Sequence, residues 1–340
     1  MLSVKILVTG GAGYIGGTVA SLLKASGHQP VAFDNFCHSR RDLLPAGIEW
    51  IEGEIADREL LESVFRAARE SDNPFHAVLH FAALIEAGES MKRPELYFRN
   101  NSASTLSLLE AMVAQQIHRL VFSSTAAVYG EPQSVPILES APLMPTNPYG
   151  HSKLLVEQML AWFHRIHGLR YASLRYFNVA GADEGPNGVV RGEAHEPESH
   201  IIPLILDVAL GRRKSISIYG NDYPTPDGTC VRDYIHVSDL ADAHLLALKA
   251  LESDAAAETP LIYNLGSGKG FSVRQVLESA RRVTGHPIPA ETQPRRPGDA
   301  AVLVASSEKA IRELGWKPRY TELEAIVRTA WIWQQKRYTA

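Results

Sequence analysis

The sequence has few cysteines and no long apolar run, and both absences narrow the class of protein. The two cysteines, Cys37 and Cys230, lie far apart and without metal-ligand spacing, so we expect no disulfide framework and a reducing, cytoplasmic location. No apolar stretch approaches the length that crosses a bilayer. The N-terminal segment runs straight into a glycine turn and is interpreted as a buried first strand, not as a signal peptide.

An excess of charge of one sign is also missing. The formal net charge is −4 over 340 residues, which gives no reason to expect nucleic acid or a membrane as a partner. Internal repeats and low-complexity tracts are absent as well. A chain of this length can bury a large core in one or two domains.

What the sequence does contain is an alternation of short apolar runs and amphipathic stretches over its first half. The apolar runs predict strands, and the stretches between them have helical spacing. Strands are predicted over 4–8, 29–33, 48–51, 77–81, 120–123 and 171–176, and helices over 15–26, 58–70, 100–116 and 149–166. Short connections between alternating elements predict parallel strands with right-handed crossovers, that is, an α/β doubly wound parallel Rossmann sheet.

The pattern changes after about residue 178. Residues 182–197 are rich in glycine, proline, glutamate and histidine and predict a surface loop. Helices are then predicted over 201–210, 240–252, 273–284 and 322–335, alternating with isolated short strands. We therefore expect two domains: a Rossmann domain over 1–178, to which later segments can return, and a smaller mixed α/β substrate domain over 179–340.

A glycine loop follows the first predicted strand. Gly10-x-x-Gly13-x-x-Gly16 leads from this strand into the first helix, which is the context that distinguishes a dinucleotide loop from a chance match. The glycines permit a tight turn and close approach to a pyrophosphate, and the helix N-terminus offers N–H groups and a positive dipole to the phosphates. The alternative is a turn in which the glycines serve packing alone.

Asp34 ends the second predicted strand, where a carboxylate accepts hydrogen bonds from an adenosine ribose. It would repel a 2′-phosphate, so NAD is favoured over NADP, although Arg40 and Arg41 lie just beyond it. Residues that end the third and fourth strands are expected near the adenine edge and in close packing with the cofactor. We assign cofactor binding to Gly10, Gly13, Tyr14, Ile15, Gly16, Asp34, Asn35, Glu54, Ile55, Phe81, Ala82 and Ala83, and also to Tyr149 and Lys153.

The candidate reacting group is Tyr149, four residues before Lys153 and therefore on the same helix face. A phenol titrates near about 10, and a lysine cation nearby is expected to lower that pKa toward the range of a general base. Lys153 can also bind the nicotinamide ribose. A hydroxyl of Ser123-Ser124-Thr125, at the end of the fifth strand, would bond the reacting oxygen. These residues predict oxidation of an alcohol.

Together these motifs resemble the extended short-chain dehydrogenase/reductase family over essentially the whole chain. The family-wide stretches are 8–16, 80–83, 122–130 and 149–153. The stretches 175–181, 227–237 and 295–299 are similar to the epimerase subgroup. The resemblance implies NAD as cofactor and interconversion of UDP-glucose and UDP-galactose, with Tyr149 as base and acid, a 4-keto intermediate and inversion at C4.

The resemblance also implies roles for single residues. Thr125, Tyr149 and Lys153 match the catalytic hydroxyl, base and activating lysine, and Asn100 and Phe177 match cofactor-contacting positions. Positions that hold the UDP part match Asn178, His200, Ile201, Ser217, Ile218, Tyr219, Arg232, Arg296 and Asp299. The side-chain chemistry of Arg232 and Arg296 supports this assignment, because a guanidinium group binds two diphosphate oxygens at once.

Three positions depart from the patterns of some family members. Ile85 stands where some carry a cofactor-contacting lysine, and His200 stands where some carry a UDP-binding asparagine. Leu303 aligns with the residue that gates sugar size, which is a bulky tyrosine in enzymes restricted to glucose and galactose. Acceptance of N-acetylated sugars or pentoses is therefore left open.

Other functions are weighed against this one. A 4,6-dehydratase needs an acid and a base after the threonine, where this chain has Ala126 and Ala127. A non-catalytic NAD-binding regulator typically loses the tyrosine or the lysine, and both are kept here. A homodimer through the two helices from Asn100 and Tyr149 is implied by the resemblance. No metal is predicted, because the loop setting of the histidines between 182 and 200 suits solvent or a nucleotide better.

Overall fold

The computed structural model describes residues 3–184, 191–296 and 299–339. The chain forms two compact units, each made of several segments. Unit 1 contains Met1–Gly130, Leu143–Arg175 and Ala241–Tyr263, and unit 2 contains Glu131–Pro142, Tyr176–Leu240 and Asn264–Ala340. The sequence placed one boundary near 178, whereas the structure has several crossings, because a late strand completes the sheet of unit 1.

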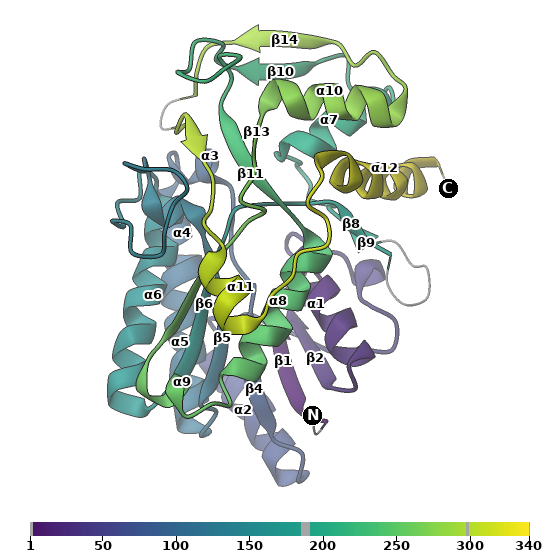
Figure 1. Cartoon of the computed structure of the whole chain (residues 1–340). Helices are drawn as coiled ribbons and strands as arrows, with labels where there is room; N and C mark the ends of the chain where they lie inside the picture. Colours follow the sequence, from purple (N-terminus) through teal and green to yellow (C-terminus); the bar gives the residue numbers. More distant parts are fainter. Residues whose placement is uncertain (1–2, 185–190, 297–298, 340) are drawn as a thin grey trace. The chain divides into compact units, whose positions relative to one another are not determined.

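The centre of unit 1 is a seven-stranded sheet with helices packed beside it (Figure 1). The strand order is β12-β6-β5-β4-β1-β2-β3. β1 pairs in parallel with β2 and with β4, and β2–β3 and β4–β5 are parallel as well. The strands are β1 (Lys5–Thr9), β2 (Gln29–Asp34), β3 (Glu49–Glu52), β4 (Phe75–His80), β5 (Arg119–Thr125), β6 (Arg170–Tyr176) and β12 (Leu261–Leu265). The predicted doubly wound parallel fold is confirmed.

The helices of unit 1 follow the predicted alternation. The long ones are α1 (Tyr14–Ala25), α2 (Arg58–Glu70), α5 (Ser104–Ala114), α6 (Pro148–His167) and α8 (Val237–Ala250), of which the first turn of α8 belongs to unit 2. Shorter ones are η1 (Arg41–Leu43), α3 (Ala87–Ser90), α4 (Pro94–Tyr97), the π-helical η2 (Phe98–Ala103), η3 (Ala126–Tyr129) and α9 (Ala255–Glu258). The predicted helix from 100 is therefore a π-helical turn followed by α5.

Local sequence explains where α6 begins and ends. The Asn147 side chain caps it by accepting from Gly150 N at 2.8 Å, and proline occupies the first turn. Gly168 stops it in the left-handed conformation, with φ 67°. The tyrosine and the lysine predicted to react therefore lie in the first two turns of a helix whose start is fixed.

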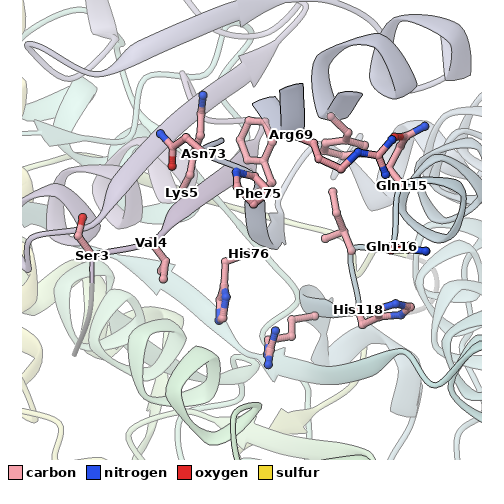
Figure 2. A pocket seen from close by; sticks show the side chains of 14 residues that line it. Ser3, Val4, Lys5, Arg69, Asn73, Phe75, His76, Gln115, Gln116 and His118 are labelled. Carbon is pink, nitrogen blue, oxygen red and sulfur yellow. The ribbon is translucent and has the colours of Figure 1, made fainter. Parts of the chain in front are cut away.

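The strands of the sheet start around a pocket of about 490 Å³ (Figure 2). Its walls come from the beginnings of β1, β4 and β5 and from the ends of α2 and α5, and include Lys5, His76 and Arg119. None of the residues predicted for cofactor or substrate lines it. The predicted cofactor residues lie instead at the opposite edge, where parallel strands end and ligands of such sheets bind.

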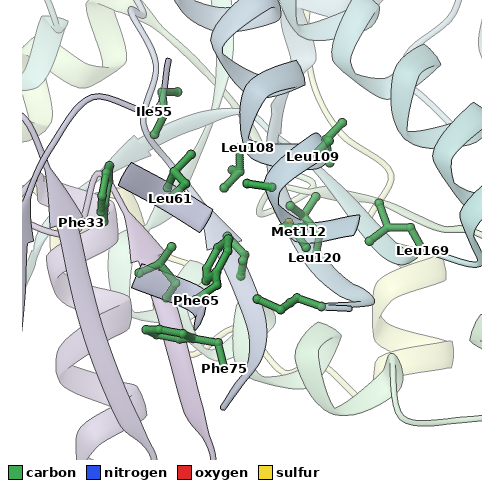
Figure 3. Close-up of a cluster of buried hydrophobic side chains, with 14 of the residues drawn as sticks. Phe33, Ile55, Leu61, Phe65, Phe75, Leu108, Leu109, Met112, Leu120 and Leu169 are labelled. Atoms are coloured by element: carbon green, nitrogen blue, oxygen red, sulfur yellow. The ribbon is translucent and has the colours of Figure 1, made fainter. Parts of the chain in front are cut away.

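The main core of unit 1 fills the space between one face of the sheet and its helices (Figure 3). Phe33 of β2, Leu61 and Phe65 of α2, and Leu108 and Met112 of α5 are buried in it. Each fully buried side chain of this size contributes about 1.5–3 kcal/mol of transfer free energy. This packing holds the strand ends, and the loops that follow them, in place.

Unit 2 is a smaller mixed assembly, as the sequence predicts. β11 (Val231–His236) pairs with β7 (Asn178–Ala180), β13 (Gly270–Ser272) and β15 (Val302–Leu303), while β10 (Ile216–Tyr219) pairs with β14 (Ala290–Gln293). Its helices are α7 (Ile201–Ala209), α10 (Val273–Thr284), α11 (Glu308–Leu314) and α12 (Leu323–Thr339). α7, α10 and α12 share a second apolar core.

Two findings complete the fold. The predicted loop over 182–197 contains a short antiparallel pair, β8 (Ala182–Asp183) with β9 (Arg191–Gly192), while 185–190 lie outside the described residues. Across the described chain, no helix has the length and hydrophobicity needed to span a membrane.

Candidate active site

The glycine loop forms a turn that only small residues can occupy. Gly10 has φ 69°, and a Cβ on it would lie 2.8 Å from Ala82 N. Gly13 caps α1 with its backbone alone, and a Cβ there would meet only Gly10 O, at 3.2 Å. The first turn of α1 carries no acidic side chain. The N-terminus of α1 therefore opens onto a cradle whose shape and dipole fit the pyrophosphate of a dinucleotide.

Asp34 lies at the end of β2 and is 8% exposed. Its Oδ2 accepts from Ala12 N at 3.0 Å, and its Oδ1 accepts from Phe36 N at 2.9 Å and Ser39 Oγ at 2.8 Å. The carboxylate therefore ties the glycine loop to the end of β2. This anchoring role was not predicted from the sequence.

The two arginines that argued for NADP are bound by carboxylates. Arg40 Nη2 lies 2.8 Å from Asp42 Oδ2, and Arg41 pairs with Glu52. The Arg41 guanidinium also lies over the Phe36 ring, 5.2 Å from its centroid. Neither arginine needs a 2′-phosphate as its counter-ion, which favours NAD.

The three residues predicted to react come together in unit 1. Thr125 ends β5 and is 8% exposed, and its side chain shares a hydrogen bond with the Tyr149 hydroxyl. Lys153 is 3% exposed and donates from Nζ to Ser123 O at 2.9 Å. Its ammonium also lies 4.9 Å from the centroid of the Phe122 ring. One edge of the sheet therefore presents a phenol, a hydroxyl and an ammonium group.

The predicted lowering of the Tyr149 pKa is contradicted, because the net shift of this pKa is upward. Burial raises the pKa of Tyr149, although the hydrogen bond with Thr125 acts in the opposite direction. Lys153 is itself desolvated, and burial lowers its pKa to about 7. The expectation failed because it treated both groups as solvated, whereas desolvation disfavours the phenolate and the ammonium alike.

A buried ion pair positions α6 and was missed from the sequence. Arg175 Nη2 lies 2.6 Å from Glu157 Oε2, with the two side chains 3% and 7% exposed. Ser124 Oγ donates to Glu157 Oε1 at 2.6 Å, and Arg175 Nη1 donates to Tyr129 OH at 2.9 Å. The network joins β5, β6 and η3 to the helix that carries Tyr149. Ser124 is thereby committed to structure, which leaves Thr125 as the candidate catalytic hydroxyl.

His80 and Asn101 are also positioning residues that the sequence did not reveal. His80 Nδ1 lies 2.7 Å from Thr9 Oγ1 and its Nε2 lies 2.8 Å from Thr105 Oγ1. Burial, with a smaller effect of Lys153, lowers the pKa of His80 to about 3, so the ring is neutral. Asn101 Nδ2 donates to Ser152 Oγ at 3.0 Å. These bonds fix the end of β4 and the start of α6.

The remaining cofactor candidates have these positions. Tyr14 and Ile15 begin α1, and Phe81, Ala82 and Ala83 follow β4. Asn35 Nδ2 donates to Glu54 Oε1 at 3.0 Å, and Ile55, beside Glu54, is buried in the core of unit 1. Asn100 lies in η2 and donates to Asn101 Oδ1 at 2.9 Å. Phe177 is buried and belongs to unit 2.

Unit 2 gathers the charged residues predicted for the diphosphate. Arg232 Nη2 lies 3.6 Å from Asp299 Oδ1, and Arg232 Nη1 donates to Ala300 O at 2.8 Å. The Arg296 guanidinium lies over the Tyr219 ring, 3.8 Å from its centroid. Asp299 N donates to Arg296 O at 3.3 Å. Two arginines, an aspartate and an aromatic ring are thus held by β10, β11 and the segment after β14.

The other substrate candidates lie on neighbouring elements of unit 2. Asn178, His200 and Ile201 line one small pocket together with Glu193 and Trp333. Ser217 and Ile218 belong to β10 with Tyr219. Leu303 lies in β15 directly opposite Arg232 of β11, and it is partly exposed. The gating position is therefore beside a diphosphate candidate.

Known proteins resemble this chain over nearly its full length. The profile of the NAD dependent epimerase/dehydratase family matches residues 6–266. A UDP-glucose 4-epimerase of Streptomyces lividans is 53% identical over 332 residues, which cover 98% of this chain and 96% of that protein. A UDP-glucose 4-epimerase of Brucella ovis, crystallised with NAD, superposes with a TM-score of 0.90 at 42% identity over 97% of this chain and 98% of that chain.

A second solved structure agrees with the first. The UDP-glucose 4-epimerase of Bifidobacterium longum, in complex with NAD+ and UDP, has a TM-score of 0.89 and 38% identity, covering 98% of each chain. The motifs quoted from the sequence and the strand order of the sheet point the same way. The chain is therefore an enzyme of the NAD dependent epimerase/dehydratase family and belongs to its UDP-glucose 4-epimerase branch.

Proposed function

We propose that this enzyme interconverts UDP-glucose and UDP-galactose by transient oxidation at C4. The observation that carries the proposal is the arrangement of Tyr149, Thr125 and Lys153 at the carboxyl edge of the sheet, where the glycine loop also lies. Membership of the epimerase branch supports the same reaction.

NAD is the cofactor in this proposal. The N-terminus of α1 with Gly10, Gly13 and Gly16 would hold the pyrophosphate, and Asp34 would accept from the adenosine ribose. The carboxylate partners of Arg40 and Arg41 support NAD over NADP. These residues would hold NAD, which would supply the acceptor and donor of the hydride at C4, so that no external oxidant would be needed.

Tyr149 moves the proton. As the phenolate, Tyr149 takes the proton of the sugar 4-hydroxyl and becomes the phenol, and it returns the proton after the 4-keto sugar has turned its other face, so that configuration at C4 inverts. Thr125, bonded to the same phenol, aligns the reacting oxygen. Lys153 supplies the nearby positive charge that the phenolate needs, in competition with the burial that raises the pKa of Tyr149.

The nucleotide part is held by unit 2. Arg232 and Arg296 would bind the diphosphate, and Asp299 and Tyr219 would bind the nucleoside. Strong binding of UDP with weak binding of the hexose is what the mechanism requires, because the keto sugar must turn while it stays tethered.

The test is conversion of UDP-galactose by the purified protein, with no added oxidant. We expect UDP-glucose to form until both sugars reach equilibrium, with NAD supplied only in the amount that the protein binds. A protein that binds NAD but leaves UDP-galactose unchanged would be the non-catalytic regulator, and the proposal would be wrong.

Sugar specificity is a second question, raised by Leu303. Its side chain is smaller than the tyrosine that restricts some family members to glucose and galactose, and it is partly exposed beside Arg232. We propose that UDP-GlcNAc is also a substrate. A panel of UDP-Glc, UDP-Gal, UDP-GlcNAc and UDP-GalNAc tests this, with Leu303→Tyr expected to lose only the N-acetyl activities.

We also propose a homodimer through α5 and α6. Trp162 and Ile166, near the end of α6, are 62% and 68% exposed, and Leu106 of α5 is 38% exposed. Large exposed apolar side chains on these two helices support a protein interface.

A further inference from the structure

Two glutamate–histidine pairs lie in the segment before α7. They repeat the spacing Glu-x-His, as Glu193 with His195 and Glu198 with His200. His195 Nδ1 lies 2.5 Å from Glu193 Oε1, and His200 Nδ1 lies 2.8 Å from Glu198 Oε1. Since an ionised carboxylate only accepts, each imidazole donates from Nδ1. The Glu198 carboxylate thereby fixes the tautomer of His200, as the carboxylate partner of a metal-binding imidazole does. A bound ion would replace the proton between Glu193 and His195.

The two pairs also converge on one point. Glu193, His195 and His200 each offer one ligand atom, and these three atoms lie within 4.8 Å of one another. In a tetrahedral zinc site, bonds of about 2.0–2.2 Å put ligand atoms about 3.4 Å apart, so the widest pair would need to close by about 1.4 Å. The two imidazole centroids are 5.8 Å apart, which suits two rings about one ion.

Glu193 ties the cluster to the body of unit 2, while His195 and His200 are partly exposed. Glu193 is 8% exposed, and its carbonyl accepts from Trp333 Nε1 at 2.8 Å. Arg337 Nη2 donates to Glu196 Oε1 at 2.8 Å, so α12 holds the segment at two points. Glu198 Oε2 is buried and has no hydrogen-bond partner among the described residues. This oxygen belongs to the residue that orients His200 and not to one of the three candidate ligands.

The charge of the cluster suits a dication. The cluster contains two carboxylates, Glu193 and Glu198, and a histidine must be neutral to bind a metal ion. A bound dication would then balance the two negative charges. Imidazole and carboxylate ligands together favour zinc and similar transition ions over calcium or magnesium.

We propose that Glu193, His195 and His200 bind a divalent zinc-class cation, with Glu198 orienting His200. The sequence predicted no metal, because the loop setting of His195 and His200 was interpreted as suiting solvent or a nucleotide better. His200 also lines the pocket with Asn178 and Ile201, so the ion would fix the side chain that this pocket presents. The proposal is independent of the reaction at C4.

The test is metal binding to the full-length protein after treatment with a chelator. Zn²⁺ is titrated by calorimetry, and Co²⁺ is titrated by its visible absorption, which reports tetrahedral coordination. We expect one ion per chain, with affinity lowered more than about a hundredfold by His195→Ala or Glu193→Gln and about 10–100-fold by Glu198→Gln. The matched control is His286→Ala, an exposed histidine of the same unit, which should bind as the wild type does.

Two outcomes would overturn the proposal. One is wild-type affinity weaker than about millimolar; the other is equal binding by the wild type, His195→Ala and Glu193→Gln. Circular dichroism of each metal-free variant checks its fold, and the isosteric Glu193→Gln carries the test if His195→Ala does not fold. Because heat and absorption are the readouts, the result does not depend on epimerase activity.

Discussion

At the scale of single residues, Lys153 is a buried lysine whose position is unfavourable for folding and useful for the reaction. Its ammonium is 3% exposed and has the Ser123 carbonyl and the Phe122 ring as neighbours. Burial lowers its pKa to about 7, from about 10.4 in an unfolded chain. A lysine that served stability alone would lie at the surface, so its burial supports a functional role.

Lys153→Met therefore separates stability from function. Between about pH 7 and pH 10 the unfolded wild type binds more protons at this site than the folded protein does, so wild-type stability rises with pH over this window. The variant should lose this slope while its activity falls at least about 100-fold. Thermal unfolding of the cofactor-free protein at several pH values measures this dependence of stability on pH. Equal slopes for both proteins would contradict the assignment.

Asp34 is the residue that decides between NAD and NADP. Asp34→Asn removes the negative charge and replaces one acceptor oxygen with a donor. It should weaken NAD binding about tenfold and reduce the ratio of NAD affinity to NADP affinity. Calorimetric titration of both dinucleotides is the measurement. Arg41→Ala is the control, because Arg41 pairs with Glu52 and should not affect NAD. Unchanged NAD affinity of Asp34→Asn would rule out the ribose contact.

At the scale of elements, α6 shows what local sequence can and cannot predict. Its start and end were predictable, because Asn147, Pro148 and Gly168 are recognised capping residues. Its anchoring was not predictable, since Glu157 and Arg175 are 18 residues apart in the chain and meet only when β6 lies beside β5. Arg175 was noticed only as part of a family motif, without a role.

Breaking that anchor should be costly. Glu157→Gln leaves the Arg175 guanidinium buried without a countercharge, and we expect the free energy of unfolding to fall by about 3–5 kcal/mol. Urea unfolding of both proteins measures this loss of free energy. Glu62→Gln is the matched control, because the Arg58–Glu62 pair lies at the surface and contributes less than about 1 kcal/mol. Similar losses in the two variants would mean that the buried pair has no special role.

At the scale of the whole molecule, the fold class was predictable and the division into units was not. Alternating apolar and amphipathic segments predict a parallel sheet whatever the partners of each strand are. β12 was missed because five residues of a short apolar run, Leu261–Leu265, do not reveal that they pair with β6. This pairing brings 241–263 into unit 1. Long-range pairing of this kind leaves no local pattern.

The candidate site also combines residues that could be predicted from the sequence with residues that could not. Tyr149, Lys153 and the glycines were predictable, because their spacing on known elements is the signal. The direction of the Tyr149 pKa shift was predicted wrongly, because the spacing of residues along the chain does not reveal how far a side chain is desolvated. His80 gave no signal either: its role depends on Thr9 and Thr105, which reach it only in the folded protein.

The proposed dimer makes a prediction at this scale. Trp162→Glu replaces a large apolar side chain of α6, 62% exposed, with a charged one. We expect the wild type to sediment as a dimer and the variant as a monomer, because an unpaired charge is costly in a buried interface. Trp50→Glu is the control, since Trp50 is also exposed but belongs to β3. A monomeric wild type would contradict the prediction.

The most direct test of the account is the rate of the Tyr149→Phe variant with UDP-galactose. This change removes one oxygen, the one bonded to Thr125, and should leave NAD binding intact. Tyr338→Phe, in α12, is the matched control. We predict that Tyr149→Phe lowers kcat by about 100- to 10,000-fold, the contribution of a positioned acid–base group, while Tyr338→Phe has no effect. A Tyr149→Phe rate within a few-fold of wild type would show that another group moves the proton.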